Sequence, residues 1–172
     1  GVLPCSGLSG AVVGHPLVWT GLSDYMDTAI MRFLFIGDIV GRPGREIVAR
    51  ALPGLIVRHQ LDLVIANAEN AAGGSGLTPS IYRELVAVGV DAITLGDHVY
   101  RRKEIYSVLE SKDNIVRPAN LPAEAVGRQW TVVQARDGSP VALFCILGQL
   151  FMKPVDNPWR CADRILEELP PG

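Results

Sequence analysis

Apolar runs alternate with helix-like patterns along the chain from Arg32 onward. Three apolar runs predict β-strands, at residues 32–36, 61–66 and 91–96. The first of these is expected to be buried on both faces. Apolar residues recur at helical spacing between and after the strands, which predicts helices over residues 45–59, 79–88 and 104–111. This order predicts an α/β fold in which helices cover a mostly parallel β-sheet.

Glycine, proline and threonine mark the boundaries of these elements. Gly41, Pro43 and Gly44 predict a turn between the first strand and its helix, and Pro53 could kink or split that helix. Thr78 is a typical helix N-cap, because a proline follows it directly.

The two ends of the chain differ from this pattern. Residues 129–147 alternate in hydrophobicity around Asp137 and Gly138, which predicts a β-hairpin, and residues 161–169 predict a last helix. Residues 1–30 contain no Lys or Arg, and Gly, Pro and Ser interrupt their apolar runs. We therefore expect an irregular N-terminal extension over residues 1–30, upstream of a natural start at Met31, and one domain over residues 31–172.

The composition is that of a globular chain. Of its 172 residues, 48% are apolar and 20% are charged, which is too apolar for a disordered protein. The net charge of −2 and the lack of a Lys/Arg run disfavour a large nucleic-acid surface. No apolar run reaches the roughly 18 residues of a membrane span, so a cytoplasmic protein is expected. Cys5, Cys145 and Cys161 fit neither a disulfide framework nor a zinc spacing, and Cys145 is expected in the core.

Polar residues follow each of the three predicted strands. Asp38 follows the first strand, Asn67, Glu69 and Asn70 the second, and Asp97 and His98 the third. Adjacent parallel strands lie about 4.8 Å apart and end at the same edge of a sheet, so these side chains could converge. Carboxylate and amide oxygens with an imidazole suit Mn²⁺, Fe or Mg²⁺, and two such ions could hold a phosphoryl oxygen and activate water.

Each segment also has a purely structural interpretation. Asp38 could cap a turn, residues 67–70 could be an ordinary polar loop, and Asp97 could cap a helix with His98 on the surface. The glycines near Asp38 are a weak phosphate-loop candidate, since the dinucleotide spacing and the Lys-Ser/Thr pair are absent. Residues 101–104 (RRKE) predict a solvated face that could also help attract an anion. A coincidence at all three strand ends is less expected than at one, which favours a shared site.

Five segments together resemble the YmdB-type metallophosphoesterases of the calcineurin-like phosphoesterase superfamily. They are MRFLFIGDIVGRPGR, LDLVIANAENAAGGSGLTP, GVDAITLGDHVYRRKEI, VRPANLP and FMKPVDNPWRCAD, and the resemblance runs from Met31 to about Leu169. It implies the first half of a four-layer α/β/β/α sandwich and a metal-dependent phosphodiesterase for 2′,3′-cyclic nucleotides or related phosphodiesters. The implied partners are this small substrate and, as an open question, a second copy of the chain, with no membrane.

The resemblance also implies a role for each residue at the strand ends. Two divalent metal ions (Fe, Mn or Mg) are expected. Asp38 would bind the first metal, Glu69 would bridge both, and Asn70 and Asp97 would bind the second. His98 would be the general acid that protonates the leaving oxygen or steadies the phosphate. The family pattern has Asn at the position of Asp97, so this chain carries an additional negative charge there.

The remaining metal ligands of the family are histidines in the second half of a longer chain. No histidine lies beyond His98 here, so we expect residues 1–172 to be the front half of such an enzyme behind a foreign leader. An apolar sheet face would then be left uncovered. Two alternatives stay open: a catalytically inactive fragment, and an α/β module that binds nucleotides through its glycine loops without metal.

Overall fold

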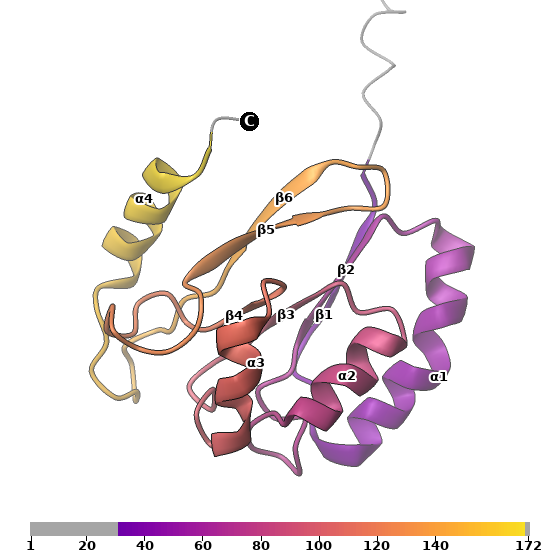
Figure 1. The fold of residues 1–172 in the computed structure, drawn as a ribbon, viewed down its shortest axis with the longest axis horizontal. Coiled ribbons are helices and arrows are strands. Elements are labelled where there is room, and N and C mark those ends of the chain that lie inside the picture. The colour runs from indigo at the N-terminus through magenta and orange to yellow at the C-terminus, as the bar shows by residue number, and fades with distance from the viewer. Residues whose placement is uncertain (1–30, 171–172) are drawn as a thin grey trace, which may run out of the picture. The chain divides into compact units, whose positions relative to one another are not determined.

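The computed structural model describes residues 31–170, which contain a parallel β-sheet followed by a β-hairpin (Figure 1). The sheet has the order β1–β2–β3–β4, with strands β1 (Phe33–Ile36), β2 (Leu63–Asn67), β3 (Ala92–Thr94) and β4 (Ile115–Val116). The expected α/β fold is confirmed. The irregular extension expected over residues 1–30 lies outside the described residues.

Helices cover one face of this sheet. They are α1 (Gly41–His59), α2 (Pro79–Ala87) and α3 (Tyr106–Ser111), the last preceded by the 3₁₀-helix η1 (Lys103–Ile105). Leu52 of α1, Leu85 of α2 and Leu109 of α3 are buried in one cluster with Val64 and Ile93 of the sheet. Each such side chain contributes roughly 1.5–3 kcal/mol when it leaves water, so this layer holds the strand ends in place.

The β-hairpin covers the other face of the sheet. Strands β5 (Trp130–Gln134) and β6 (Pro140–Phe144) pair antiparallel, as predicted. Val133 and Leu143 pack on Ile65 of β2, while Trp130 and Phe144 pack on α4 (Pro158–Glu168) on the other side. The order helix, sheet, hairpin, helix is the layering that the sequence resemblance implied.

The expectation that the first strand is buried on both faces is wrong. Leu34 and Ile36 pack against the helix layer, but Phe33 and Phe35 are 61% and 51% exposed on the opposite face. β1 is an edge strand of the sheet, and the hairpin packs on β2, β3 and β4 rather than on β1. An exposed apolar sheet face was expected, and part of it lies here.

Some element boundaries also differ from the prediction. Gly41, Pro43 and Gly44 are not a separate turn but lie in the first turn of α1, where proline is tolerated because its missing N–H has no partner to lose. Pro53 lies inside α1 without ending it. Thr78 caps α2 as predicted, since its Oγ1 accepts a hydrogen bond from the Ile81 amide at 3.4 Å. Within residues 31–170, no helix has the length and apolar character needed to cross a bilayer.

Candidate active site

The three strand ends bring their polar residues to the same edge of the sheet. β1, β2 and β3 are adjacent and parallel, with Ile36 opposite Ala66 and Asn67 opposite Thr94. The residues beyond these positions therefore leave the sheet together, and this places all five predicted side chains at the carboxyl edge. They are Asp38, Glu69, Asn70, Asp97 and His98.

Asn70 is the central contact of this group. Its Nδ2 donates to both carboxylate oxygens of Asp38, at 2.9 and 3.0 Å, and its Oδ1 contacts Nδ1 of His98. Because an amide oxygen only accepts, Nδ1 of His98 carries the proton in this arrangement. The other ring nitrogen, Nε2, then faces the Asp97 carboxylate, with 3.6 Å between Nε2 and Oδ2.

Glu69, Asp97 and His98 form a compact set of donors. Each offers one ligand atom, and these atoms lie within 4.8 Å of one another. Ligand distances of about 2.0–2.6 Å let a single divalent ion contact atoms separated in this way. Asp38 is outside this triad, but Asn70 connects it to His98. The carboxylate donors present therefore fit a hard divalent cation, with the imidazole of His98 close to the same point.

Gly96 shapes the site, although it was not among the predicted residues. A Cβ at this position would overlap the Glu69 carboxylate, so only glycine leaves room for that group. Glu69 is held there by its Oε2, which accepts a hydrogen bond from the backbone amide of His98 at 3.0 Å. The sequence signal that could have identified Gly96 is its position between a predicted strand and the Asp97–His98 pair.

Asn67, at the end of β2, is a second residue whose position is informative. Its Oδ1 is buried and has no hydrogen-bond partner among the described residues. An unmet buried acceptor costs roughly 1–3 kcal/mol. Oδ1 of Asn67 is therefore an acceptor at the end of β2 that a ligand of the site could use.

The helix-capping interpretation of Asp97 is wrong, whereas the turn interpretation of Asp38 and the polar-loop interpretation of residues 67–70 stay predictions. The N-cap of α1 is Val40 and makes no side-chain capping bond, so Asp38 does not cap this helix. Residues 97–100 form a turn, and the next helical segment is capped at Arg102, so Asp97 caps no helix. The side chain of His98 is 28% exposed and contacts Asn70. Asn70 therefore joins Asp38 and His98, whichever structural role each residue also has.

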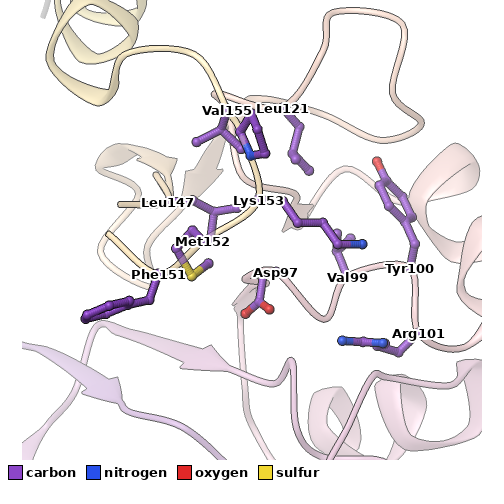
Figure 2. Close-up of a pocket in the computed structure, with 11 residues that line it drawn as sticks. Asp97, Val99, Tyr100, Arg101, Leu121, Leu147, Phe151, Met152, Lys153 and Val155 are labelled. Carbon is purple, nitrogen blue, oxygen red and sulfur yellow. The ribbon is translucent and has the colours of Figure 1, made fainter. Parts of the chain in front are cut away.

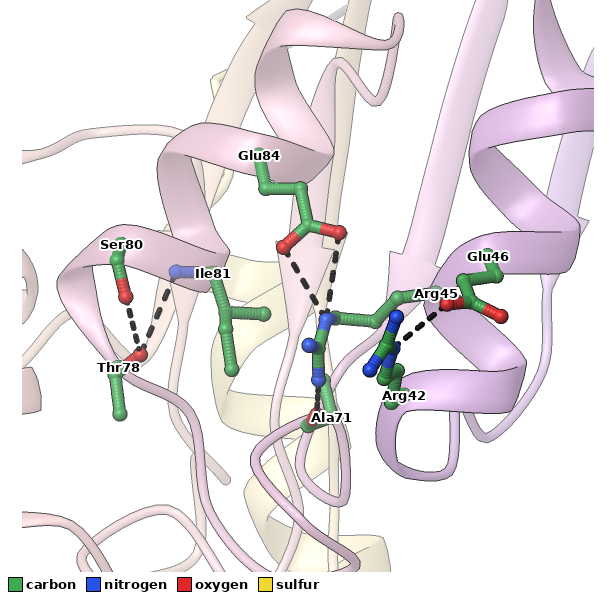
Figure 3. A network of polar contacts seen from close by, with 8 residues as sticks. All are labelled: Arg42, Arg45, Glu46, Ala71, Thr78, Ser80, Ile81 and Glu84. Carbon is green, nitrogen blue, oxygen red and sulfur yellow. Dashed lines mark hydrogen bonds and ion pairs between the residues drawn. The ribbon is translucent and has the colours of Figure 1, made fainter.

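Two arginines hold the glycine-rich loop that carries Glu69 and Asn70. Arg45 of α1 donates to the Ala71 carbonyl at 2.6 Å and pairs with Glu84 of α2 at 3.2 Å (Figure 3). On the other side of the loop, Arg102 donates to the carbonyls of Ala72 and Ser75, both at 3.2 Å. The loop is therefore bonded to α1 through Arg45, which also pairs with α2, and to the N-cap residue of η1 through Arg102.

Cys145 lies just beyond β6 and contacts the same region from the hairpin layer. Its Sγ donates to the Leu95 carbonyl at 2.9 Å. Burial raises the pKa of the Cys145 thiol to about 12, and the nearby charge of Glu69 adds to this effect. The thiol is thus protonated at neutral pH and packs against the core, as the sequence predicted.

Comparison with known proteins assigns the described region to a family. A family model described as YmdB-like protein matches residues 34–171. A 2′,3′-cyclic-nucleotide 2′-phosphodiesterase of Bacillus subtilis is 43% identical over 138 residues, which are 80% of this chain and 52% of that protein. A putative phosphatase/phosphodiesterase of Mycoplasma genitalium is 38% identical over 91 residues, 53% of this chain and 32% of that protein.

Two solved structures have a similar fold. A hypothetical protein from Thermus thermophilus superposes with a TM-score of 0.76 at 43% identity, covering 81% of this chain and 54% of its own. A novel phosphatase from Mycoplasma pneumoniae superposes with a TM-score of 0.73 at 31% identity. The match covers 80% of this chain and 51% of the phosphatase chain. The chain thus spans about half the length of the Bacillus phosphodiesterase and of both structures.

Proposed function

The chain belongs to the YmdB-like family, and from this premise we propose that it carries part of the active site of a metal-dependent phosphodiesterase. The proposed substrates are 2′,3′-cyclic nucleotides or related phosphodiesters. The Bacillus relative bears the name of a 2′,3′-cyclic-nucleotide 2′-phosphodiesterase, which supports this substrate class.

One observation carries the proposal: polar groups from three strand ends meet at a single point. Glu69, Asp97 and His98 place donor atoms within 4.8 Å of one another, and Asn70 links Asp38 to them. The two carboxylates in this set, Glu69 and Asp97, repel each other unless positive charge is present, and Asp38 adds a third negative charge beside them through Asn70. A divalent cation supplies that charge, which supports a metal site over a chance cluster.

Asp38, Glu69, Asn70 and Asp97 are the proposed metal-binding residues. Two divalent ions such as Fe, Mn or Mg would, when bound, provide an activated water at neutral pH and offset the charge of the phosphoryl oxygens. Glu69 is best placed to serve both ions, since its carboxylate lies between the loop after β2 and the turn after β3.

His98 is the proposed general acid. Its Nδ1–H donates to Asn70, so Nε2 is the nitrogen that can carry a second proton toward the substrate. In the proposed reaction a water releases one proton to solvent, its oxygen bonds to phosphorus, and the P–O2′ bond breaks. The Nε2 proton passes to the leaving O2′, and the 3′ ester remains. The product is a nucleoside 3′-phosphate.

The glycine loop does not favour the alternative of a metal-free nucleotide module. A phosphate-binding loop presents free backbone N–H groups to its ligand. Here the amides of Ala72 and Gly74 donate to the carbonyls of Gly76 and Asn70, at 2.9 and 3.0 Å. These donors are already occupied within the loop, so its better-supported role is to position Glu69 and Asn70.

Metal titration of the full 172-residue chain tests the proposal. We expect Mn²⁺ to bind saturably in calorimetry, to raise the thermal midpoint, and to be required for conversion of 2′,3′-cyclic AMP to adenosine 3′-phosphate. Glu69→Gln keeps the size of the side chain but removes its charge, and should weaken Mn²⁺ binding at least tenfold.

Glu110→Gln is the matched control, because Glu110 is exposed on α3 and away from the strand ends. It should bind Mn²⁺ as the unchanged chain does. Equal affinity in both variants would remove Glu69 from the metal site. A chain that neither binds Mn²⁺ nor hydrolyses the cyclic nucleotide would support the inactive-fragment alternative.

A further inference from the structure

A cavity of about 440 Å³ lies directly beside the candidate active site (Figure 2). Asp97 belongs both to the wall of this cavity and to the triad of donor atoms. The remaining wall comes from the segment after β3, from residues 147–155 between β6 and α4, and from Leu121 between β4 and β5. Ligand cavities commonly have volumes of about 300–1,000 Å³, so the space suits a small molecule.

Hydrogen bonds fix both walls of the cavity. The hydroxyl of Tyr100 donates to the Val126 carbonyl at 2.6 Å, and its ring stacks on Tyr106 with 5.3 Å between centroids. On the other wall, the buried amide of Asn120 accepts from the backbone N–H of Leu147 at 2.9 Å and donates to its carbonyl at 2.8 Å. These contacts hold Tyr100 and Leu147, one residue on each side of the cavity, in place.

Two positive charges face this space from opposite segments of the chain. Arg101 follows His98 in the turn, and Lys153 belongs to the segment before α4. Figure 2 shows both head groups directed toward the space beside the Asp97 carboxylate. Neither makes an ion pair within residues 31–170, where the Asp97 carboxylate lies 3.6 Å from Nε2 of His98. An anionic group can therefore bind both cations.

The rest of the cavity wall is mainly apolar. Leu121, Leu147, Met152 and Val155 contribute aliphatic surface, and the fixed ring of Tyr100 lies beside them. Two cations next to an apolar wall match a ligand with an anionic end and a flat, weakly polar body. A nucleoside phosphate has this chemistry, whereas inorganic phosphate would leave the apolar wall unused.

We infer that this cavity is the nucleoside subsite of the candidate active site, with Arg101 and Lys153 bound to the phosphate and the nucleoside packed against the wall that includes Met152. The inference rests on the proposed phosphodiesterase function, since it places the phosphate beside Asp97 and His98. It also gives residues 101–104 a more specific role than a solvated face, through Arg101.

Methionine-methyl NMR on the full chain tests the inference. The chain has three methionines, and replacing Met152 with Leu identifies its signal. Adenosine 3′-phosphate in the presence of Mg²⁺ should shift the Met152 methyl saturably. The methyl of Met31, which is partly buried against the hairpin cluster and outside the cavity, should stay unmoved. Lys153→Met should raise the Kd roughly tenfold, about the loss of one charge-assisted contact.

Lys112→Met is the matched control, because Lys112 is an exposed lysine outside this cavity, and its Kd should stay within about twofold. An unmoved Met152 signal, or a Kd that Lys153→Met leaves unchanged, would overturn the inference. Inorganic phosphate that shifts Met152 as strongly as the nucleotide would overturn the nucleoside assignment.

Hydrolysis of 2′,3′-cyclic AMP, measured in parallel, separates the proposed function from the proposed subsite. A saturable Met152 shift without hydrolysis of 2′,3′-cyclic AMP removes the proposed function but keeps a nucleotide site. Hydrolysis with an unmoved Met152 keeps the function and removes the subsite.

Discussion

Asn70 shows how one side chain can organise a site. Its amide has both a donor and an acceptor, so it can bind the Asp38 carboxylate and the His98 imidazole at the same time. An Asp at this position could accept from His98 but would repel Asp38. The identity of this residue therefore sets both the position of Asp38 and the tautomer of His98.

Gly96 provides a test of the role of Glu69. We expect Gly96→Ala to lower Mn²⁺ affinity at least tenfold, because the new Cβ would displace the Glu69 carboxylate. The thermal midpoint should move by only a few degrees, since that carboxylate is the flexible end of its side chain. Calorimetry and thermal unfolding measure the two effects.

The control is Gly148→Ala, whose new Cβ has no atom within 4 Å. Gly148→Ala should change neither the Mn²⁺ affinity nor the thermal midpoint. Unchanged Mn²⁺ affinity in Gly96→Ala would mean that Glu69 does not bind the metal from its position here.

At the scale of elements, α1 shows how tertiary packing outweighs local preference. The helix contains Pro53 followed by Gly54, both unfavourable in a helix interior. It persists because Val48 and Leu52 are buried against the sheet. A better helix former on the exposed side of α1 should therefore raise the stability of the protein.

Gly54→Ala should stabilise the protein by roughly 0.5–1 kcal/mol, because alanine restricts the unfolded chain and favours the helix. No atom lies within 4 Å of the added Cβ. Urea unfolding at pH 7 measures the change. Gly89→Ala is the opposing control and should destabilise, since Gly89 has φ +109° and its Cβ would meet Ile56. Changes of the same sign in both variants would contradict this explanation.

At the scale of the whole molecule, three acidic groups in different parts of the structure are held protonated. Burial raises the pKa of Tyr82 on α2, of Tyr100 beside the cavity, and of Cys145, which reaches about 12. The unfolded chain releases these protons at a lower pH than the folded protein does. Proton release at alkaline pH therefore favours the unfolded state.

We accordingly expect the free energy of unfolding to be constant with respect to these groups below about pH 8 and to fall as the pH rises from roughly 8.5 through 10 and beyond. Urea unfolding between pH 7.5 and 10.5 measures this loss. Tyr82→Phe should show a smaller decline above pH 9.5, because it lacks one of the three groups. A free energy of unfolding that stays flat to pH 10.5 would contradict the expectation.

The sequence by itself determined the succession of strands and helices, the hairpin, and the presence of Asp38, Glu69, Asn70, Asp97 and His98 after three strands. These features are local, because periodicity, turn residues and caps act over a few neighbouring positions. The two-residue strand β4 was too short to produce such a pattern.

Only the tertiary structure decided which side chains meet. Three features join residues that are distant in the chain: the Asn70 bridge, the room that Gly96 leaves for Glu69, and the cavity between Arg101 and Lys153. The exposure of Phe33 depends on which strand lies at the edge of the sheet. Such contacts follow from strand order, register and the layer that covers each face, and no local pattern of residues encodes these.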